Sequence, residues 1–478
     1  MSDHWDVIVV GAGSAGLPTA IRAAQRGARV LQIEADTKIG GTLFLSSGQI
    51  SAAGTKRQKK LGIEDTAQDH YEDAQRIAEG TINPTMGKLA TDNAGATYDW
   101  LEELGYAPFP HMPVAGGAHE PYLTKRYYWA ETAAVAILDV LKPVHDGLVA
   151  DGKIDLRLAT RMTGIVADAS GAAVGVTVET AGGKSETLHG HNIVVTTGGY
   201  AHNADLWKEM TPDIPLRAYT NDFSRGDGLM AARKIGAKVD GADTFLCTFA
   251  GVLNDPKDPY STALGMQFSP QVREPWEIYV NTDGKRFVRE DHPSVDHREH
   301  ALLAQKNQQM FIVFDEGIRQ NAPALNPLDT KMREKFGAHP HYSKADTLSG
   351  LAQQMGVNAA NLEATVKAYN DAVASGADKA FGRIRMFRKI QKGPFYAIHA
   401  GGITVVSPAG LNTNERLQVM KADGAPIPNL YAAGEVLGFG RLSGKAFVNG
   451  MSLMPALTFG RLLGEKLLQW EGARAAAE

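Results

Sequence analysis

Three histidines lie close together in the segment REDHPSVDHREH, at residues 289–300, and one of them directly follows Asp296. A histidine side chain titrates at about pH 6.5, so it can move a proton at neutral pH, and a neighbouring carboxylate can fix its orientation. We therefore expect His292 or His297 to transfer a proton, with Asp296 as the group that orients the ring. The alternative interpretation is a solvated turn that leads into a helix and leaves the histidines facing water.

A second set of candidate acid–base groups lies in the glycine- and aromatic-rich segment HMPVAGGAHEPYLTKRYYWAETA, at residues 111–133. Tyr127 and Tyr128 in this segment carry phenol groups that could give or take a proton. The same two tyrosines also fit an aromatic packing cluster, because a tryptophan follows them. The sequence leaves both interpretations open.

A larger fold must position these side chains, and its best-defined part is the segment DVIVVGAGSAGLPTAIRAAQRGARVLQIE, at residues 6–34. The pattern predicts a strand, a glycine turn, a helix and a second strand that ends at Glu34. The glycines at positions 11, 13 and 16 allow backbone N–H groups to approach a pyrophosphate at the helix N-terminus, and Glu34 can accept hydrogen bonds from a ribose. The segment therefore predicts a dinucleotide-binding βαβ unit.

The composition sets limits on the class of protein. The chain has 478 residues, more than one core usually supports, so we expect at least two domains. A net charge of −4 provides no basic surface, so we expect no nucleic-acid partner. The single cysteine, Cys247, argues against a thiolate metal site or a cysteine-ligated iron–sulfur cluster, and we expect no metal site. The sequence shows no membrane span or signal peptide, which favours a cytoplasmic protein.

The residues after Glu34 begin a series of motifs that indicates a protein family. The stretch ADTKIGGTLFLSSGQISAAG contains a glycine pair at 40–41 and a Ser–Ser–Gly turn at 46–48. Later segments complete the series: IVVTTGGYAHN (193–203), SRGDGLMAARKIGAKV (224–239), DGKRFVRE (283–290), GPFYAIHAGG (393–402) and IPNLYAAGEVLG (427–438). Together these motifs resemble the FAD-dependent fumarate reductase / 3-oxosteroid 1-dehydrogenase flavoprotein family over nearly the whole chain. The resemblance implies that the dinucleotide is FAD.

The resemblance also implies an α/β fold, in which a discontinuous Rossmann-like FAD-binding domain carries an inserted α+β capping domain. We place the FAD-binding domain at 1–241 and 403–478, and the capping domain, which closes over the flavin and helps to bind substrate, at 242–402. Thr42 stands where family members that tether their cofactor carry a histidine, so we expect non-covalent FAD. The residues expected to contact FAD are Gly11, Gly13, Ser14, Ala15, Gly16, Glu34, Ala35, Gly40, Gly41, Thr42, Ser46, Ser47, Gly48, Thr197, Gly198, Gly199, Asp227, Gly434, Glu435, Gly450, Ser452 and Leu453.

Other residues occupy the family's substrate-binding positions. The fumarate-type histidine pair matches Val405 and Val406, and the carboxylate-binding arginine matches Phe447. The catalytic arginine of the reductases and the catalytic tyrosine of the steroid enzymes both match Ser294 or Val295. The resemblance therefore implies the family's scaffold with a rewritten active site.

Two further catalytic candidates follow from the resemblance. Arg273 matches the arginine of the reductase proton relay, although the relay's glutamate matches Pro270. His399 lies beside a glycine pair, near the loop that faces the flavin in family members. The loop at 111–133, which contains Tyr127 and Tyr128, reaches the substrate in this family.

We therefore expect an oxidoreductase of CH–CH bonds that introduces a double bond α,β to a ketone, with a cyclic substrate, by hydride transfer to flavin N5. The alternative is an enoate reductase that binds one carboxylate through Arg441, Lys445 or Arg273. A third hypothesis is a flavin-binding protein without turnover. Only one complete GxGxxG unit is present, so we expect a small-molecule substrate and an external electron donor or acceptor, such as a quinone, a flavoprotein or a dye.

Overall fold

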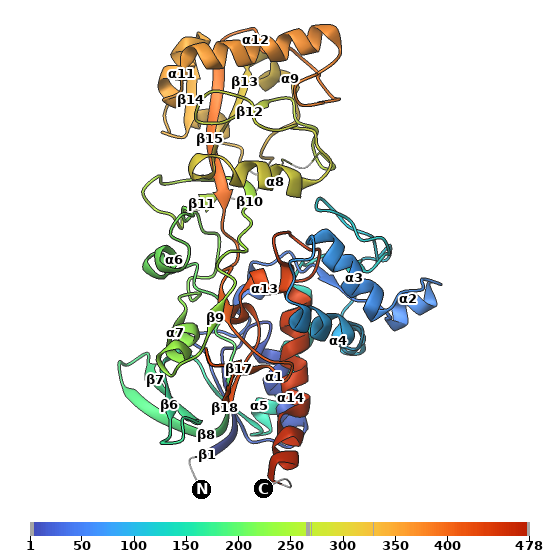
Figure 1. Cartoon of the computed structure of the whole chain (residues 1–478), viewed down its shortest axis with the longest axis vertical. Coiled ribbons are helices and arrows are strands. Elements are labelled where there is room, and N and C mark those ends of the chain that lie inside the picture. Colours follow the sequence, from blue (N-terminus) through green and yellow to red (C-terminus); the bar gives the residue numbers. More distant parts are fainter. Residues whose placement is uncertain (1–3, 264–267, 269, 328, 476–478) are drawn as a thin grey trace.

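The computed structural model describes residues 4–263, 268, 270–327 and 329–475. These residues form two lobes, one built on an eight-stranded sheet and the other on a six-stranded sheet (Figure 1). Both ends of the described chain lie in the lower lobe of Figure 1. The chain returns from the upper lobe along β15 (Phe395–Ile403), which points down toward the lower lobe in the figure.

The sheet of the lower lobe is mostly parallel and follows the βαβ pattern predicted from the sequence. Its strand order is β17–β18–β8–β1–β2–β5, and β7 and β6 extend it beside β8. The first strand, β1 (His4–Val10), pairs in parallel with β2 (Val30–Ile33) and β8 (Ser185–Val195). Since a parallel sheet is buried on both faces, these strands carry runs of apolar residues, and Val7 to Val10 are all buried.

Helices cover this sheet. α1 (Gly16–Gln25) follows β1 directly, and the long α14 (Leu453–Ala475) and α5 (Val135–Ala150) pack against it. The remaining strands of the sheet are β5 (Ile154–Arg157), β6 (Thr160–Ala167), β7 (Ala173–Thr180), β17 (Gln418–Met420) and β18 (Pro426–Ala432). The Rossmann-like arrangement predicted from the motifs is therefore confirmed.

Between β2 and β5, the chain forms a group of helices at the side of the lower lobe. It contains α2 (Lys56–Lys60), α3 (Ala67–Ile77) and α4 (Pro84–Glu103), which lie at one side of the lobe in Figure 1. A short ribbon of β3 (Ile50–Ser51) and β4 (Tyr127–Tyr128) closes it. The smaller elements are η1 (Gly41–Phe44), α6 (Ala204–Met210), α7 (Asp227–Lys234), β9 (Val239–Asp240), β16 (Gly410–Leu411), η3 (Glu435–Leu437) and α13 (Phe439–Ser443).

The upper lobe has an antiparallel sheet with helices on it, as expected for an inserted α+β unit. Its order is β11–β10–β15–β13–β12, with β14 beside β15. The strands are β10 (Thr248–Leu253), β11 (Thr262–Ala263), β12 (Ile278–Val280), β13 (Gln309–Asp315) and β14 (Tyr342–Ala345), and the helices are α8 (Val295–Leu303), η2 (Lys306–Gln308), α9 (Glu316–Asn321), α10 (Met332–Lys335), α11 (Leu348–Met355) and α12 (Ala359–Ser375). No helix among the described residues is both long enough and apolar enough to cross a membrane.

Candidate functional site

A groove opens in the lower lobe where β1, β2 and β8 end. Parts of the chain that are far apart in sequence meet there, because carboxyl ends of parallel strands lie at one edge of the sheet. The groove is lined by these residues from the predicted cofactor set: Gly11, Gly13, Ser14, Ala15, Glu34, Ala35, Gly41, Thr42, Thr197, Gly198, Asp227, Gly434 and Glu435. The structure thus brings most of that set together.

The groove has the features that FAD needs. α1 begins without a side-chain cap, and although Leu17 N donates to the Gly13 carbonyl (3.0 Å), the start of the helix can face a pyrophosphate. The Glu34 carboxylate accepts hydrogen bonds from Ala12 N (2.7 Å) and Asp36 N (2.9 Å), and burial raises its pKa. Thr197 Oγ1 is buried and has no hydrogen-bond partner within the described structure. Thr197 lines the groove, and an unpaired buried hydroxyl at such a place is uncommon in a native structure.

Two of the predicted cofactor residues shape the groove in other ways, Gly16 through close packing and Asp227 through an ion pair. A Cβ atom at Gly16 would lie 2.0 Å from the carbonyl oxygen of Gly11, so only glycine lets α1 start this close to the preceding turn. Asp227 lines the groove, but Arg161 holds its carboxylate through two hydrogen bonds of 2.6 and 2.7 Å. The predicted residues that do not line the groove are Gly16, Gly40, Ser46, Ser47, Gly48, Gly199, Gly450, Ser452 and Leu453, and their contact with FAD stays a prediction.

A buried acid–base cluster joins the two lobes. His119, from the loop that follows α4, donates a hydrogen bond from Nδ1 to Oδ1 of Asp296 in α8 (2.9 Å). The other oxygen of Asp296 accepts a hydrogen bond from the backbone N–H of Glu120 (2.9 Å). Oε2 of the buried Glu299, one turn further along α8, lies 4.0 Å from His119 Nδ1. The ring of Phe447 stacks on the His119 ring with centroids 5.0 Å apart.

The electrostatics of this cluster favour a stored proton. Burial opposes the charged form of His119, but the hydrogen bond to Asp296 and the charge of Glu299 outweigh it and raise the pKa of His119. Burial also acts on Asp296, yet His119 and two backbone N–H groups lower its pKa. Complete burial raises the pKa of Glu299 to about 8. The three groups are therefore coupled: the pKa of Asp296 is lowered, whereas the pKa values of His119 and Glu299 are raised.

The cluster lies next to the start of α14. Asn449 donates from Nδ2 to the Glu120 carbonyl (2.9 Å), and its own carbonyl accepts a hydrogen bond from the Tyr122 hydroxyl (2.5 Å). Gly450 packs against β3, where a Cβ atom would lie 2.3 Å from Ser51 N. Gly450, Ser452 and Leu453 are the predicted contacts at the flavin end of this helix, and Asn449 links that end to the backbone of Glu120, the residue after His119.

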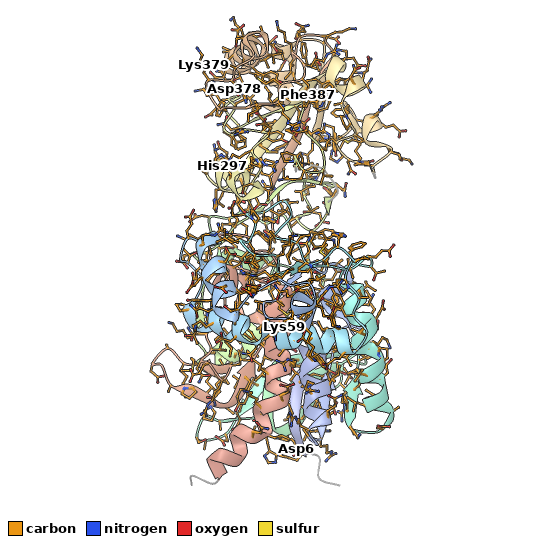
Figure 2. All side chains as sticks on the ribbon, turned by 90° about the vertical axis from the view of Figure 1, so that its right-hand side faces the viewer. Asp6, Lys59, His297, Asp378, Lys379 and Phe387 are labelled. Atoms are coloured by element: carbon orange, nitrogen blue, oxygen red, sulfur yellow. The ribbon has the colours of Figure 1, made fainter. Side chains whose placement is uncertain are left out.

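The structure pairs Asp296 with His119 instead of with His292 or His297, and the expected role of these two histidines in proton transfer stays a prediction. The rings of His292 and His297 stack on each other with centroids 4.0 Å apart, and His297 is exposed on the side of the upper lobe (Figure 2). The physical reason is the start of α8 at Val295, just after Pro293. Residues three apart share a helix face, so Asp296 and Glu299 point inward together. The residues of the segment that precede α8, 289–294, instead match the alternative interpretation of a turn that leads into a helix.

The two tyrosines and Arg273 have partners of their own. Tyr127 and Tyr128 are buried in β4, burial raises the pKa of both, and the Tyr128 hydroxyl bonds to Thr55 Oγ1 (3.0 Å). These contacts agree with the packing interpretation. Arg273 is buried and forms two hydrogen bonds with the carboxylate of Glu277 (2.8 and 2.9 Å).

The carboxylate-binding candidates do not gather at the cluster either. The buried Arg441 donates to the Leu411 carbonyl (2.8 Å), and Lys445 is exposed, with its carbonyl bonded to His300 Nε2 (2.8 Å). Within the described structure, neither Arg441, Lys445 nor Arg273 bonds to His119, Asp296 or Glu299.

His399 lies on the other face of β15. A Cβ atom at Gly401 would meet the Arg217 guanidinium, whereas one at Gly402 would meet Cys247, whose Sγ faces the Glu299 carbonyl (3.9 Å). Side chains alternate between the faces of a strand, so His399 shares the face of Gly401 and points away from Glu299. The structure therefore does not bring His399 to the acid–base cluster.

No motif in the sequence pointed to His119 or Glu299 as functional residues. His119 lies in the predicted substrate loop at 111–133, and Glu299 lies in the segment at 289–300. Their donor atoms and those of Asp296 all lie within 4.8 Å of one another, close enough to hold a cation. The expectation that the protein has no metal site stays a prediction.

Comparisons with known proteins agree with the geometry. The sequence profile of the FAD binding domain family matches residues 6–447. The chain is 30% identical to the fumarate reductase (cytochrome) of Shewanella frigidimarina over 98% of its own length and 78% of that protein. It is 26% identical to the urocanate reductase of Eggerthella lenta, covering 96% and 74% of the two chains. It is 24% identical to the 4-oxocyclohexanecarboxylate 2-dehydrogenase of Sinomonas cyclohexanicum, covering 97% and 92%.

Solved structures share the fold. The open conformation of a flavocytochrome c3 fumarate reductase superposes with a TM-score of 0.74 at 28% identity, over 97% of this chain and 78% of that one. The 3-ketosteroid Δ1-dehydrogenase from Sterolibacterium denitrificans gives 0.76 at 20% identity, over 98% and 100%. The second likeness concerns the fold alone.

Proposed function

The chain belongs to the FAD binding domain family, and on that premise we propose that it reduces a carbon–carbon double bond conjugated to an electron-withdrawing group, with His119 as the proton donor. The protein is an FAD-dependent oxidoreductase of CH–CH bonds. Bound FAD supplies the hydride that such a reduction needs. The polypeptide must then supply a proton, a place for the substrate and protection from water.

The observation that carries this proposal is the His119–Asp296 hydrogen bond. An ionised carboxylate can only accept, so Asp296 holds the proton on Nδ1 of His119 and leaves Nε2 for the substrate. In its charged form, His119 can give its Nε2 proton to the substrate carbon and remain a neutral ring bonded to Asp296. The raised pKa of His119 favours this acid role over that of a base.

The surroundings of His119 favour a substrate with little negative charge. Phe447 covers the His119 ring. In the sequence, valines stand at 405 and 406, the positions that match the fumarate-type histidine pair. Of the cationic candidates, Arg273 is paired with Glu277 and Arg441 donates to a backbone carbonyl. Two of the relatives have names that refer to ring compounds, urocanate and 4-oxocyclohexanecarboxylate. We therefore propose a cyclic or aromatic substrate that carries at most one carboxylate.

A second candidate function is the reverse reaction, dehydrogenation α,β to a ketone in a ring. In that direction the neutral His119 ring, still bonded to Asp296, would accept at Nε2 the proton from one carbon of the substrate, while the hydride from the adjacent carbon would pass to bound FAD. The relative from Sinomonas cyclohexanicum, whose name states a dehydrogenase of a ring ketone, supports keeping this candidate.

Rapid-reaction absorbance of the bound flavin tests both candidates. Photoreduced holoenzyme is mixed anaerobically with cinnamate-type enoates and cyclic enones, and oxidised holoenzyme with saturated cyclic ketones. Re-oxidation by the unsaturated compounds is the expected result. Bleaching by saturated ketones alone would support dehydrogenation instead, and silence in both arms would leave a flavin protein without turnover.

We further propose that electrons come from an external carrier, such as a quinone or another flavoprotein, and that the protein works in the cytoplasm. One complete GxGxxG unit supports the first point, since that unit is taken up by the FAD groove. Reduction assays with a soluble quinol or dye test the first point, and cell fractionation tests the second.

A further inference from the structure

A second cavity, of about 190 Å³, lies on the face of β15 that carries His399. Arg217 lines it from the segment between α6 and α7, while His341 and His399 line it from the upper lobe. This is the face opposite to the one that holds Glu299, as the contacts of Gly401 and Gly402 show. The cavity is therefore separate from both the FAD groove and the His119 cluster.

Arg217 is a buried cation without a matching anion. Its side chain belongs to a residue that is 9% exposed, and Nη2 donates to the Asn307 carbonyl (3.1 Å). Nη1 is buried and has no hydrogen-bond partner among the described residues. No acidic residue is among those that line the cavity in the described part of the chain. Burying an unpaired guanidinium is costly, and its pKa is lowered accordingly.

The sequence around β15 makes room for this arrangement. A Cβ atom at Gly401 would lie 2.7 Å from Cζ of Arg217, so a glycine is needed for the guanidinium to lie flat on the strand. The missing side chain at Gly401 thus allows the Arg217 guanidinium to lie at the cavity. A buried charge held in this way is more typical of a ligand site than of a structural core.

Two imidazoles complete the site. The rings of His341 and His399 meet edge to face with centroids 4.8 Å apart. Burial lowers the pKa of both, and each is lowered further by a neighbouring histidine and by Arg217, so that the pKa of His399 falls to about 4. The groups that face the two histidines are therefore cationic or neutral. An anion bound between the rings would instead raise the pKa of both.

We propose that this cavity binds a small oxyanion, a carboxylate or a phosphate, with Arg217 as its charge partner and His341 and His399 as further hydrogen-bond donors. Guanidinium groups bind both oxyanions through paired, charge-assisted hydrogen bonds. Arg217 lies beside the end of β15, since its carbonyl accepts a hydrogen bond from Thr404 N (2.8 Å). A bound anion would therefore join this segment to His341 and His399 of the upper lobe.

The test is anion binding to the purified holoenzyme, measured by calorimetry and by the shift of the thermal unfolding midpoint. Inorganic phosphate and succinate are the two probes, with sodium chloride at equal ionic strength as the blank. Binding stabilises the folded state by RT ln(1 + L/Kd), where L is the free anion concentration, so the midpoint should rise with the logarithm of the anion concentration above the Kd. The Arg217→Gln variant should bind the preferred anion about ten- to a hundredfold more weakly, as expected for the loss of one charged hydrogen-bonding partner.

Arg333→Gln is the matched control, because it removes the same charge from an exposed position in α10 of the upper lobe. It should bind the anion like the parent. If Arg217→Gln is not recovered folded, His341→Asn, at a half-buried position, takes its place with a weaker expected loss. A response to phosphate alone or to succinate alone identifies the source of the oxyanion. Equal binding by parent and variants, or no binding of either probe up to about 50 mM, where even weak charge-assisted sites fill, would overturn the proposal.

Discussion

Asp296 of the upper lobe and His119 of the lower lobe are joined by a hydrogen bond of 2.9 Å, although 177 positions separate them in the sequence. Each lobe therefore contributes half of the acid–base pair. The pair therefore depends on the arrangement of the two lobes seen in this structure.

Replacement of His119 by glutamine should slow re-oxidation of the reduced flavin by substrate about 10²- to 10⁴-fold, the usual effect of losing a general acid. The FAD content should stay unchanged, because His119 does not line the groove. The control is His297→Ala, an exposed histidine in the same region. Stopped-flow absorbance measures both rates. A slow His297→Ala together with a fast His119→Gln would restore the proton-transfer role predicted for residues 289–300.

The rate should also depend on pH in a direction that the His119 pKa sets. The pKa is raised, so the charged donor is present at low pH and is lost as the pH rises through that pKa. Asp296→Asn removes the main stabilising partner, so the alkaline limb should move to lower pH by about one unit or more. A pH–rate profile of both proteins gives the answer. An unshifted limb in the variant would show that a different group is titrating.

Acid precipitation should release intact FAD and leave a colourless pellet. The reason is that Thr42, at the edge of the groove, replaces the histidine that tethers the cofactor in some family members. Absorbance and chromatography of the supernatant measure the release. A yellow pellet would indicate a covalent bond.

Glu34→Gln should weaken FAD binding about ten- to a hundredfold, because a charged hydrogen-bond acceptor is worth about 1.5–3 kcal/mol. The Glu34 carboxylate already orders the turn through Ala12 and Asp36, so part of the loss arises before the ribose is bound. Fluorescence titration of the apoprotein with FAD measures the affinity. The exposed Glu64→Gln is the matched control and should bind FAD like the parent.

NADH and NADPH should not reduce the flavin rapidly and stoichiometrically. The chain has one complete dinucleotide unit, and the predicted FAD residues use it. Anaerobic mixing while the flavin absorbance is followed provides the measurement, with dithionite as the positive control. Fast reduction by either nicotinamide would require a second binding site.

The sequence predicted the parts of the molecule that depend on near neighbours. The strand, turn and helix from β1 to α1 and the acid at Glu34 follow from spacing alone, and the structure contains each of them. The proton-transfer pair could not be predicted in the same way. Asp296 has histidines beside it in sequence, but the helix that begins at Val295 turns it toward a loop from the other lobe. Likewise, side chains alternate along β15, which places His399 on the face away from Glu299. This placement could be recognised only once the neighbours of the strand were known.

The complete burial of Glu299 has a consequence for the whole fold. Its pKa of about 8 lies above the ordinary value of 4.5, so the folded state binds a proton that the unfolded state has already lost between these two values. The free energy of unfolding contributed by this residue therefore declines as the pH rises from about 4.5 to about 8 and is constant above that range. Beyond the upper value, two carboxylates carry charge beside His119, so alkaline conditions remove a stabilising proton from the contact between the two lobes.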